Sequence, residues 1–315
     1  MLFNSFKHLF RIKVQKMVAC YKQYDTIPPA PDTVELLQHT LKTVKTRAFV
    51  FWWVINGNGF VYHLKPLFMN GRHFSFDEQI LFGLEPKTET PNYEIALLCI
   101  VTAGTYITYI VSNITSLLII TAGYSEARAL TLGGELRHLW DDAEQYYKEN
   151  FDDQYKEGTD PKADKEINKY IRKRLRRIAQ SHSININLVI NLDDIFREAI
   201  AVEFLLLSLS LIADLLADLR HTYIIMPFPL MQVGMDCFTG QRLMNAGIEF
   251  ENAIYDSKWE NFDSNNRMMV LLILQMAQKN LTLSAGGVVV LGFASLMSLF
   301  KKIYSAYTTL QSTMK

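Results

Sequence analysis

The chain has few groups that bind metals or form crosslinks, and no excess of charge. Its 315 residues include three cysteines, Cys20, Cys99 and Cys237, which are too scattered for a disulfide framework or a zinc site. Lys and Arg total 32, and so do Asp and Glu, so the formal net charge is zero. Zero charge argues against a nucleic-acid partner, whose binding requires neutralised phosphates. The hydrophobic fraction of 49% excludes a disordered chain.

Motifs that indicate an enzyme are also missing. The sequence contains no GxGxxG, GxSxG or HExxH, and its seven histidines are dispersed. Asp193 and Asp194, with Arg197 and Glu198 a turn later, could hold a metal or act as paired acids, but acids next to a basic group at a helix start are typically solvated. Glu203 and Asp214 lie in an apolar helix, where ionisable groups are often functional, although a helix contact or the membrane boundary also fits them. We therefore expect no catalytic residue, no cofactor and no metal.

Long apolar runs are what the chain does have. Residues 95–125 form a stretch of 31 residues without a charge, and about 20 residues suffice for a helix to cross the hydrocarbon core. Further apolar runs lie at 48–64, 199–217, 221–235 and 280–300, the last continuing to residue 314, and a shorter apolar helix is expected at 268–278. The sequence predicts an all-α polytopic transmembrane helical bundle with five spans.

The basic residues of the linkers predict the orientation of these spans. Residues 1–47 hold eight Lys and Arg, 65–94 hold three, 126–185 hold twelve, the turn between the third and fourth spans holds one, and 242–279 hold four. Because cytoplasmic loops are richer in Lys and Arg, the N-terminus is predicted to be cytoplasmic and the C-terminus extracellular.

This orientation divides the chain into six regions. They are a cytoplasmic N-terminal segment (1–47), two spans with an extracellular loop at 65–94 (48–125), a cytoplasmic helical region (126–198), the third and fourth spans (199–241), a second cytoplasmic helical region (242–279) and the last helix (280–315). Pro28, Pro29 and Pro31 are expected to split the first segment into two helices. Residues 126–177 have helical spacing with one turn at 158–161, which predicts long helices below the membrane.

Aromatic and sulfur-containing side chains gather where the spans would meet near the outer leaflet. Together with one threonine they form a candidate pocket for a small volatile molecule: Phe60, Tyr62, Thr102, Tyr106, Tyr109, Tyr223, Met226 and Phe228. The same residue types are ordinary in the aromatic belt of a membrane protein and in helix packing. Both interpretations fit the sequence.

The last predicted helix combines small and hydroxyl residues with apolar ones. Ser284, Gly286, Gly287, Gly292, Ser295, Ser298, Ser305, Thr308, Thr309, Ser312 and Thr313 recur along it. Small residues allow helices to approach closely, and a hydroxyl face lines water-filled pores in oligomers. Composition alone favours neither packing nor permeation.

The C-terminal third resembles the insect odorant receptors. It has Tyr255 and Trp259, then Arg267, then the run Lys-Asn-Leu-Thr-Leu-Ser-Ala-Gly at 279–286, and finally Phe300 and Tyr-Ser-Ala-Tyr at 304–307. It departs from the family pattern in having Asn280 where proline is usual and Ala306 where an aromatic residue often stands. Pro91-Asn92-Tyr93 and the stretch 130–139 extend the resemblance upstream.

The resemblance implies an odorant-gated cation channel subunit in the plasma membrane of olfactory sensory neurons. It implies a heterotetramer with a shared co-receptor, a small volatile organic ligand in the outer half of the bundle, and a last helix that lines the pore. Thr309 and Thr313 would then face the pore, with Ser312 beside it. The second cytoplasmic loop is short for a co-receptor, which favours a ligand-tuning subunit.

Family members have seven spans, so the five predicted here correspond to the third to seventh, and we expect the first two to be missing. A non-functional truncated receptor fragment is therefore an alternative to the channel subunit. A gustatory-type chemoreceptor has the same architecture, but its hydrophobic run ending in Gln-Phe is absent. A G-protein-coupled receptor does not fit the orientation. A transporter or membrane enzyme would require Glu203 or Asp214 for turnover.

Overall fold

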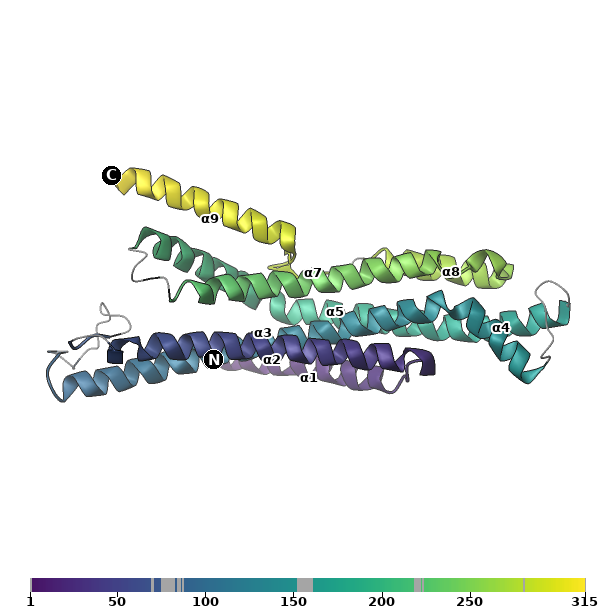
Figure 1. Ribbon diagram of the computed structural model, residues 1–315, viewed down its shortest axis with the longest axis horizontal. Helices are drawn as coiled ribbons and strands as arrows, with labels where there is room; N and C mark the ends of the chain where they lie inside the picture. The colour runs from purple at the N-terminus through teal and green to yellow at the C-terminus, as the bar shows by residue number, and fades with distance from the viewer. Residues whose placement is uncertain are drawn as a thin grey trace. The chain divides into compact units, whose positions relative to one another are not determined.

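The structure is a computed structural model that describes residues 2–68, 71–74, 83, 86, 88–151, 161–217, 222, 224–279 and 281–314. Its ribbon consists mainly of long helices (Figure 1). The chain divides into two compact units. Unit 1 comprises Met1–Val44, Thr121–Ile200 and Thr239–Leu291, and unit 2 comprises Lys45–Ile120, Ala201–Phe238 and Gly292–Lys315.

The elements follow one another in a simple order. They are α1 (Leu2–Asp25), η1 (Pro31–Thr33), α2 (Val34–Leu64), η2 (Lys65–Phe68), α3 (Asn92–Arg137), α4 (Leu139–Asn150), α5 (Pro161–Leu216), α7 (Pro227–Tyr255), η3 (Trp259–Asn261), α8 (Ser264–Ala277), β1 (Ser284–Ala285), β2 (Val289–Val290) and α9 (Phe293–Met314). The predicted all-helical class is confirmed for the described residues, with the two short strands as its exception.

Proline sets the first helix boundary. α1 ends at Asp25, and the next helical turn begins at Pro31, so the predicted split of the N-terminal segment is confirmed. Proline cannot continue a helix and restricts the residue before it. The expected long helices after residue 126 are present too, since α3 continues to Arg137 and α5 extends over 56 residues. Of the predicted turn at 158–161, residues 158–160 lie outside the described residues, and Pro161 begins α5.

Two helices have the length and composition to cross a membrane. They are α3 over Asn92–Arg137 and α5 over Lys162–Leu216. Large apolar side chains on both are exposed, including Leu98 at 69% and Leu205 at 61%. Exposed apolar surface of this kind is typical of a site that contacts a membrane or another protein. The other three predicted spans overlap α2, α7 and α9, and the number of spans stays a prediction.

Unit 1 has its own hydrophobic core. One face of α5 contributes Ile167, Ile171, Leu175 and Ile178, all fully buried and spaced three or four residues apart. They pack in one cluster with residues of α3, α4, α7 and α8, among them Leu136, Leu139, Phe250 and Val270. Residues that the sequence places in two separate helical regions, 126–198 and 242–279, therefore form one packed body.

A β-hairpin precedes the last helix and corrects the prediction of one continuous helix over 280–315. β1 and β2 are antiparallel, and α9 begins only at Phe293. Gly286 and Gly287 between the strands have φ of 64° and 72°, values that glycine adopts without steric cost. The hairpin is held in unit 1, because Gly286 N donates to Arg197 O at 2.8 Å and Ser284 N donates to Asp193 Oδ1 at 2.6 Å.

Two further boundaries differ from the sequence prediction. The fourth apolar run was expected to start at residue 221, whereas α7 begins at Pro227, because proline is well suited to the first position of a helix. The short apolar helix expected at 268–278 is α8, and it starts earlier, at Ser264. Asp263 caps it by accepting a hydrogen bond from Asn266 N.

Candidate functional site

The candidate site lies in unit 2, which contains every residue predicted to bind ligand or line a pore. Its central contact is between α2 and α3, and small residues make that contact close. A Cβ atom added at Gly104 of α3 would overlap the His63 ring of α2, and one added at Gly59 of α2 would stand 2.8 Å from Thr108 Cγ2 of α3. Small residues allow this approach between membrane helices.

Two asparagines of α2 add polar contacts near the same region. Asn56 Nδ2 donates to Ser112 Oγ of α3 at 2.8 Å, and Asn58 Nδ2 donates to the carbonyl oxygen of Ile224 at 3.0 Å. Each bond satisfies a polar group that would otherwise be costly in an apolar environment. These asparagines fix α2 against α3 and against the chain just before α7.

The predicted pocket residues occupy different environments. Tyr62 is buried and its ring stands 5.6 Å from that of His63. Phe228 packs on a buried cluster formed by Ala48, Phe51, Ile55 and Ile119. Met226 is half-buried, whereas Phe60, Thr102, Tyr106 and Tyr109 are exposed. Tyr223 lies outside the described residues. The structure thus places Tyr62 and Phe228 in packed positions, and the role of this set in ligand binding stays a prediction.

Unit 2 also contains a buried polar cluster, of which the sequence singled out only Glu203. Gln232 of α7 donates through Nε2 to Thr115 Oγ1 of α3 and to Glu203 Oε1 of α5. Asp236, one helical turn after Gln232, is fully buried. The sequence identified Glu203 but ended the fourth span at residue 235, just before Asp236. The signal was the spacing of four residues between Gln232 and Asp236, which places both on one face of a helix.

The final turns of α9 carry the three predicted pore residues, and all three are exposed. Ser312 Oγ donates to the carbonyl oxygen of Thr309 at 2.8 Å, and Thr313 Oγ1 donates to the same carbonyl at 3.0 Å. Thr309 Oγ1 donates to the carbonyl oxygen of Ser305 at 2.9 Å. Because each hydroxyl hydrogen is directed to the backbone, the oxygen lone pairs remain available to the surroundings.

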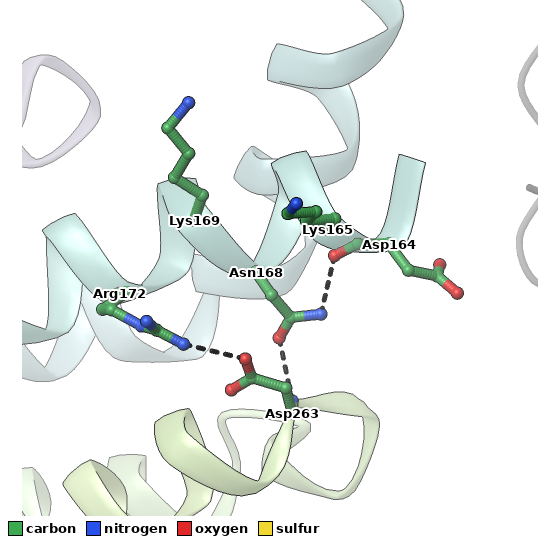
Figure 2. A pocket seen from close by; sticks show the side chains of 6 residues that line it. All are labelled: Asp164, Lys165, Asn168, Lys169, Arg172 and Asp263. Atoms are coloured by element: carbon green, nitrogen blue, oxygen red, sulfur yellow. Dashed lines mark hydrogen bonds and ion pairs between the residues drawn. The ribbon is translucent and has the colours of Figure 1, made fainter. Parts of the chain in front are cut away.

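Unit 1 holds a separate cleft of about 440 Å³, lined by Asp164, Lys165, Asn168, Lys169, Arg172 and Asp263. Figure 2 shows Arg172 and Asn168 of α5 directed toward Asp263 at the start of α8. Arg172 Nη2 lies 2.9 Å from Asp263 Oδ2, and Asn168 Oδ1 accepts from Asp263 N at 2.8 Å. These groups hold the start of α8 on α5, which gives the cleft a structural role.

Buried charges in unit 1 are paired. Glu135, whose side chain is 1% exposed, lies 2.5 Å from Arg177 Nη2 and also accepts from Ala30 N at 2.9 Å. Glu126 is bound by Arg242 at 2.6 Å. The hydrogen bond from Arg137 to Glu249 raises the pKa of that guanidinium, and burial raises the pKa of the Tyr24 phenol. These pairs connect helices that are distant in sequence and indicate a rigid support, not a reaction centre. In the described part of the chain, no group of three or more His, Cys, Asp or Glu side chains is arranged to hold a metal.

Comparison with solved structures identifies the fold over nearly the whole chain. Among solved structures, the insect olfactory receptor OR5 from Machilis hrabei matches with a TM-score of 0.67 and 13% identity, covering 96% of this chain and 76% of that one. The same receptor in complex with eugenol matches with a TM-score of 0.56 and 11% identity, covering 94% and 70%. At this identity the likeness shows the fold, and that fold is the one of an insect olfactory receptor.

Sequence relatives point to the same family. Odorant receptor 22c of Drosophila melanogaster is 25% identical over 129 residues, which are 38% of this chain and 32% of that protein. The match therefore spans about a third of the relative's length. The family model described as 7tm Odorant receptor matches residues 2–304, nearly the entire chain. The resemblance seen in the C-terminal third is thus confirmed, and the chain belongs to the odorant receptor family.

Proposed function

We propose that this chain is a subunit of an odorant-gated cation channel and acts with a shared co-receptor in the plasma membrane of olfactory sensory neurons. Membership of the odorant receptor family supports the receptor role. The similarity of fold to a receptor solved with eugenol supports binding of a small, mostly apolar ligand within the helical bundle. The proposed topology has five spans, a cytoplasmic N-terminus and an extracellular C-terminus, with the six regions inferred from the sequence.

The observation that carries the channel proposal is the exposed hydroxyl face of α9. Ser305, Thr309 and Ser312 are spaced four and three residues apart, so they share one face of the helix, and all are exposed. Their hydroxyls donate to the helix backbone, or lie beside groups that do, which leaves oxygen lone pairs directed outward. Oxygen-rich surfaces stabilise partly dehydrated cations. A helix with this face, repeated around an axis in an oligomer, would line a cation pore.

The proposed odorant pocket lies among α2, α3 and the start of α7 in unit 2. Tyr62 and Phe228 would form its packed wall, and Phe60, Thr102, Tyr106, Tyr109, Tyr223 and Met226 would complete it. Aromatic and thioether side chains give favourable contacts to small volatile molecules at little cost in conformational entropy. A hydroxyl such as that of Tyr62 would fix the orientation of a polar odorant.

The test is ligand-evoked current in cells that express this chain with an olfactory co-receptor. A panel of volatile compounds that includes eugenol is applied while the current is recorded, and cells with the co-receptor alone are the control. The proposal predicts a current that requires this chain and whose ligand preference changes when Tyr62 is replaced by Phe. If the chain reaches the cell surface and no compound changes the current, the proposal is wrong.

A further inference from the structure

The buried polar cluster of unit 2 is built from three helices and has no role in the proposed pore or pocket. Its members are Thr115 of α3, Glu203 of α5, and Gln232 and Asp236 of α7, and we call it the carboxylate cluster. The amide nitrogen of Gln232 connects the first two by donating to Thr115 Oγ1 and Glu203 Oε1. Because Gln232 and Asp236 are four residues apart, Asp236 continues the cluster along the same face of α7.

Several oxygens of this cluster have no partner within the described structure. Asp236 and Gln232 are both 0% exposed. Neither carboxylate oxygen of Asp236 accepts a hydrogen bond, and Gln232 Oε1 accepts none. A buried carboxylate without a partner is costly, since desolvation is not repaid by any contact. Three oxygen acceptors are therefore held in the interior of one helical unit with their lone pairs unused.

The cluster also contains two acidic side chains and no basic one. Buried Asp236 interacts electrostatically with half-buried Glu203, so the cluster contains two carboxyl groups. In the described part of the chain, neither carboxylate takes part in an ion pair with Lys, Arg or His. Two like charges in a medium of low dielectric constant repel strongly unless a cation lies between them or a proton neutralises one of them. The cluster therefore lacks a balancing positive charge, and its unpartnered side-chain atoms, Asp236 Oδ1, Asp236 Oδ2 and Gln232 Oε1, are all oxygens.

We propose that the carboxylate cluster binds a hard cation through oxygen. The carboxylate of Asp236, Gln232 Oε1 and the carboxylate of Glu203 would be its ligands, with Thr115 Oγ1 nearby. Carboxylate and amide oxygens are the ligands that Ca²⁺ prefers, and Na⁺ shares this oxygen chemistry. Bound between α5 and α7, the cation would join helices that contribute to the same unit as the proposed pocket. The site concerns a resident ion and stands independently of odorant gating.

The experiment measures thermal unfolding of the full chain, purified into lipid nanodiscs, at constant pH and ionic strength. Choline chloride is replaced by NaCl in one series, and CaCl₂ is titrated into choline chloride in the other. A ligand that binds the folded state raises the midpoint, by roughly 5 °C at a hundred-fold excess over the dissociation constant. We expect such a rise with at least one cation, and the responding series identifies Na⁺ or Ca²⁺ as the ion.

Variants assign the effect to the cluster. Asp236→Asn is expected to remove the cation-dependent rise, and Glu203→Gln, which keeps the side-chain shape and an acceptor for Gln232, is expected to reduce it. The second variant serves if the first does not fold. Asp214→Asn is the matched control, because it changes another aspartate of the same helical unit, on α5, and should keep the full rise.

Three results would overturn the proposal. The first is a wild-type midpoint that is the same in choline, Na⁺ and Ca²⁺, and the second is a rise that persists in both cluster variants. The third is a midpoint that responds to acidification alone, with Asp236→Asn removing that response, which would mean that a proton neutralises the two carboxylates.

Discussion

Gly104 of α3 lies against the imidazole ring of His63 of α2 so closely that a Cβ atom at position 104 would overlap the ring. Gly104→Ala should therefore destabilise unit 2 by about 1 to 3 kcal/mol, the usual cost of overpacking. Gly57→Ala is the control on α2, since an added Cβ there meets nothing within 4 Å. We expect unchanged or slightly higher stability for it, because alanine favours helix. Thermal unfolding in nanodiscs measures both, and equal midpoints for the two variants would contradict the close contact.

The buried ion pair between Glu135 and Arg177 predicts a second stability effect. Glu135→Gln removes the negative charge beside Arg177, which is only 29% exposed. Leaving one member of a buried pair uncompensated costs roughly 3 kcal/mol. Glu166→Gln removes a pair with Lys169, whose side chain is 75% exposed, and should cost less than about 1 kcal/mol. Denaturation of the two purified variants gives the comparison, and a cost at Glu135 no larger than that at Glu166 would refute it.

His182 predicts how stability depends on pH. It is buried in unit 1, where its ring stacks on Phe250 with centroids 4.1 Å apart. Both ring nitrogens of His182 are buried without a hydrogen-bond partner, and this burial lowers the pKa of His182 from 6.5 to about 4. The unfolded state therefore binds the proton more tightly. Stability is fully present above pH 6.5 and falls by about 3 kcal/mol as the pH drops through 6.5 toward 4.

The variant His182→Phe removes this titration and keeps an aromatic ring against Phe250. Its stability should fall less between pH 6.5 and 4.5 than that of the wild type, as measured by unfolding in a series of buffers. His39 is exposed, so His39→Phe serves as the control and should retain the wild-type pH dependence. Identical pH profiles for wild type and His182→Phe would show that His182 is not the responsible group.

The hairpin before α9 depends on one of two adjacent aspartates. Asp193 Oδ1 accepts from Ser284 N at 2.6 Å and from Ser284 Oγ at 2.9 Å. Asp194 instead pairs with Lys13 at 3.0 Å on the surface, where that contact lowers the pKa of its carboxyl. Asp193→Ala should cost about 1 to 3 kcal/mol, because the amide of Ser284 loses its acceptor. Asp194→Ala should cost about 1 kcal/mol or less.

Hydrogen exchange at Ser284 locates the effect. Faster exchange of the hairpin amides is expected in Asp193→Ala and not in Asp194→Ala. If both variants exchange alike, the contact between Asp193 and the hairpin does not hold it in place. The sequence interpretation of both aspartates as solvated charge partners fits Asp194 and not Asp193.

Much of the fold was accessible from sequence because its signals are local. Each signal acts within a few helical turns. The charge-free run at 95–125 predicts α3, the prolines at 28–31 predict the end of α1, and the helical spacing after residue 126 predicts the long helices that include α5. The hairpin at 284–290 was missed because residues 280–300 carry no charge and are mostly apolar, as a membrane span would be. Its turn depends on backbone conformation at Gly286 and on Asp193, which lies 91 residues away from Ser284.

The carboxylate cluster shows the same limit more clearly. Hydropathy identified Glu203 as unusual, but its partners Thr115 and Gln232 are polar residues scattered among apolar ones on other helices. The spacing of Gln232 and Asp236 places those two on one face of α7, but only tertiary packing brings Thr115 and Glu203 to them. Conversely, the odorant receptor motifs from Tyr255 onward were recognisable because they are contiguous, and the family match over residues 2–304 extends them across the chain.

The central claim is that α9 lines a cation pore, and cysteine accessibility tests it most directly. Thr309→Cys and Gln311→Cys are compared in a Cys99→Ser background, because Cys99 is exposed and would otherwise react. Thr309 lies on the hydroxyl face, whereas Gln311 lies about 200° away around the helix. Each variant is co-expressed with a co-receptor, and ligand-evoked current is recorded before and after a charged thiol reagent is applied. We predict that the reagent blocks the current through Thr309→Cys and leaves that through Gln311→Cys unchanged. Equal block of both variants, or block of neither, would contradict the account.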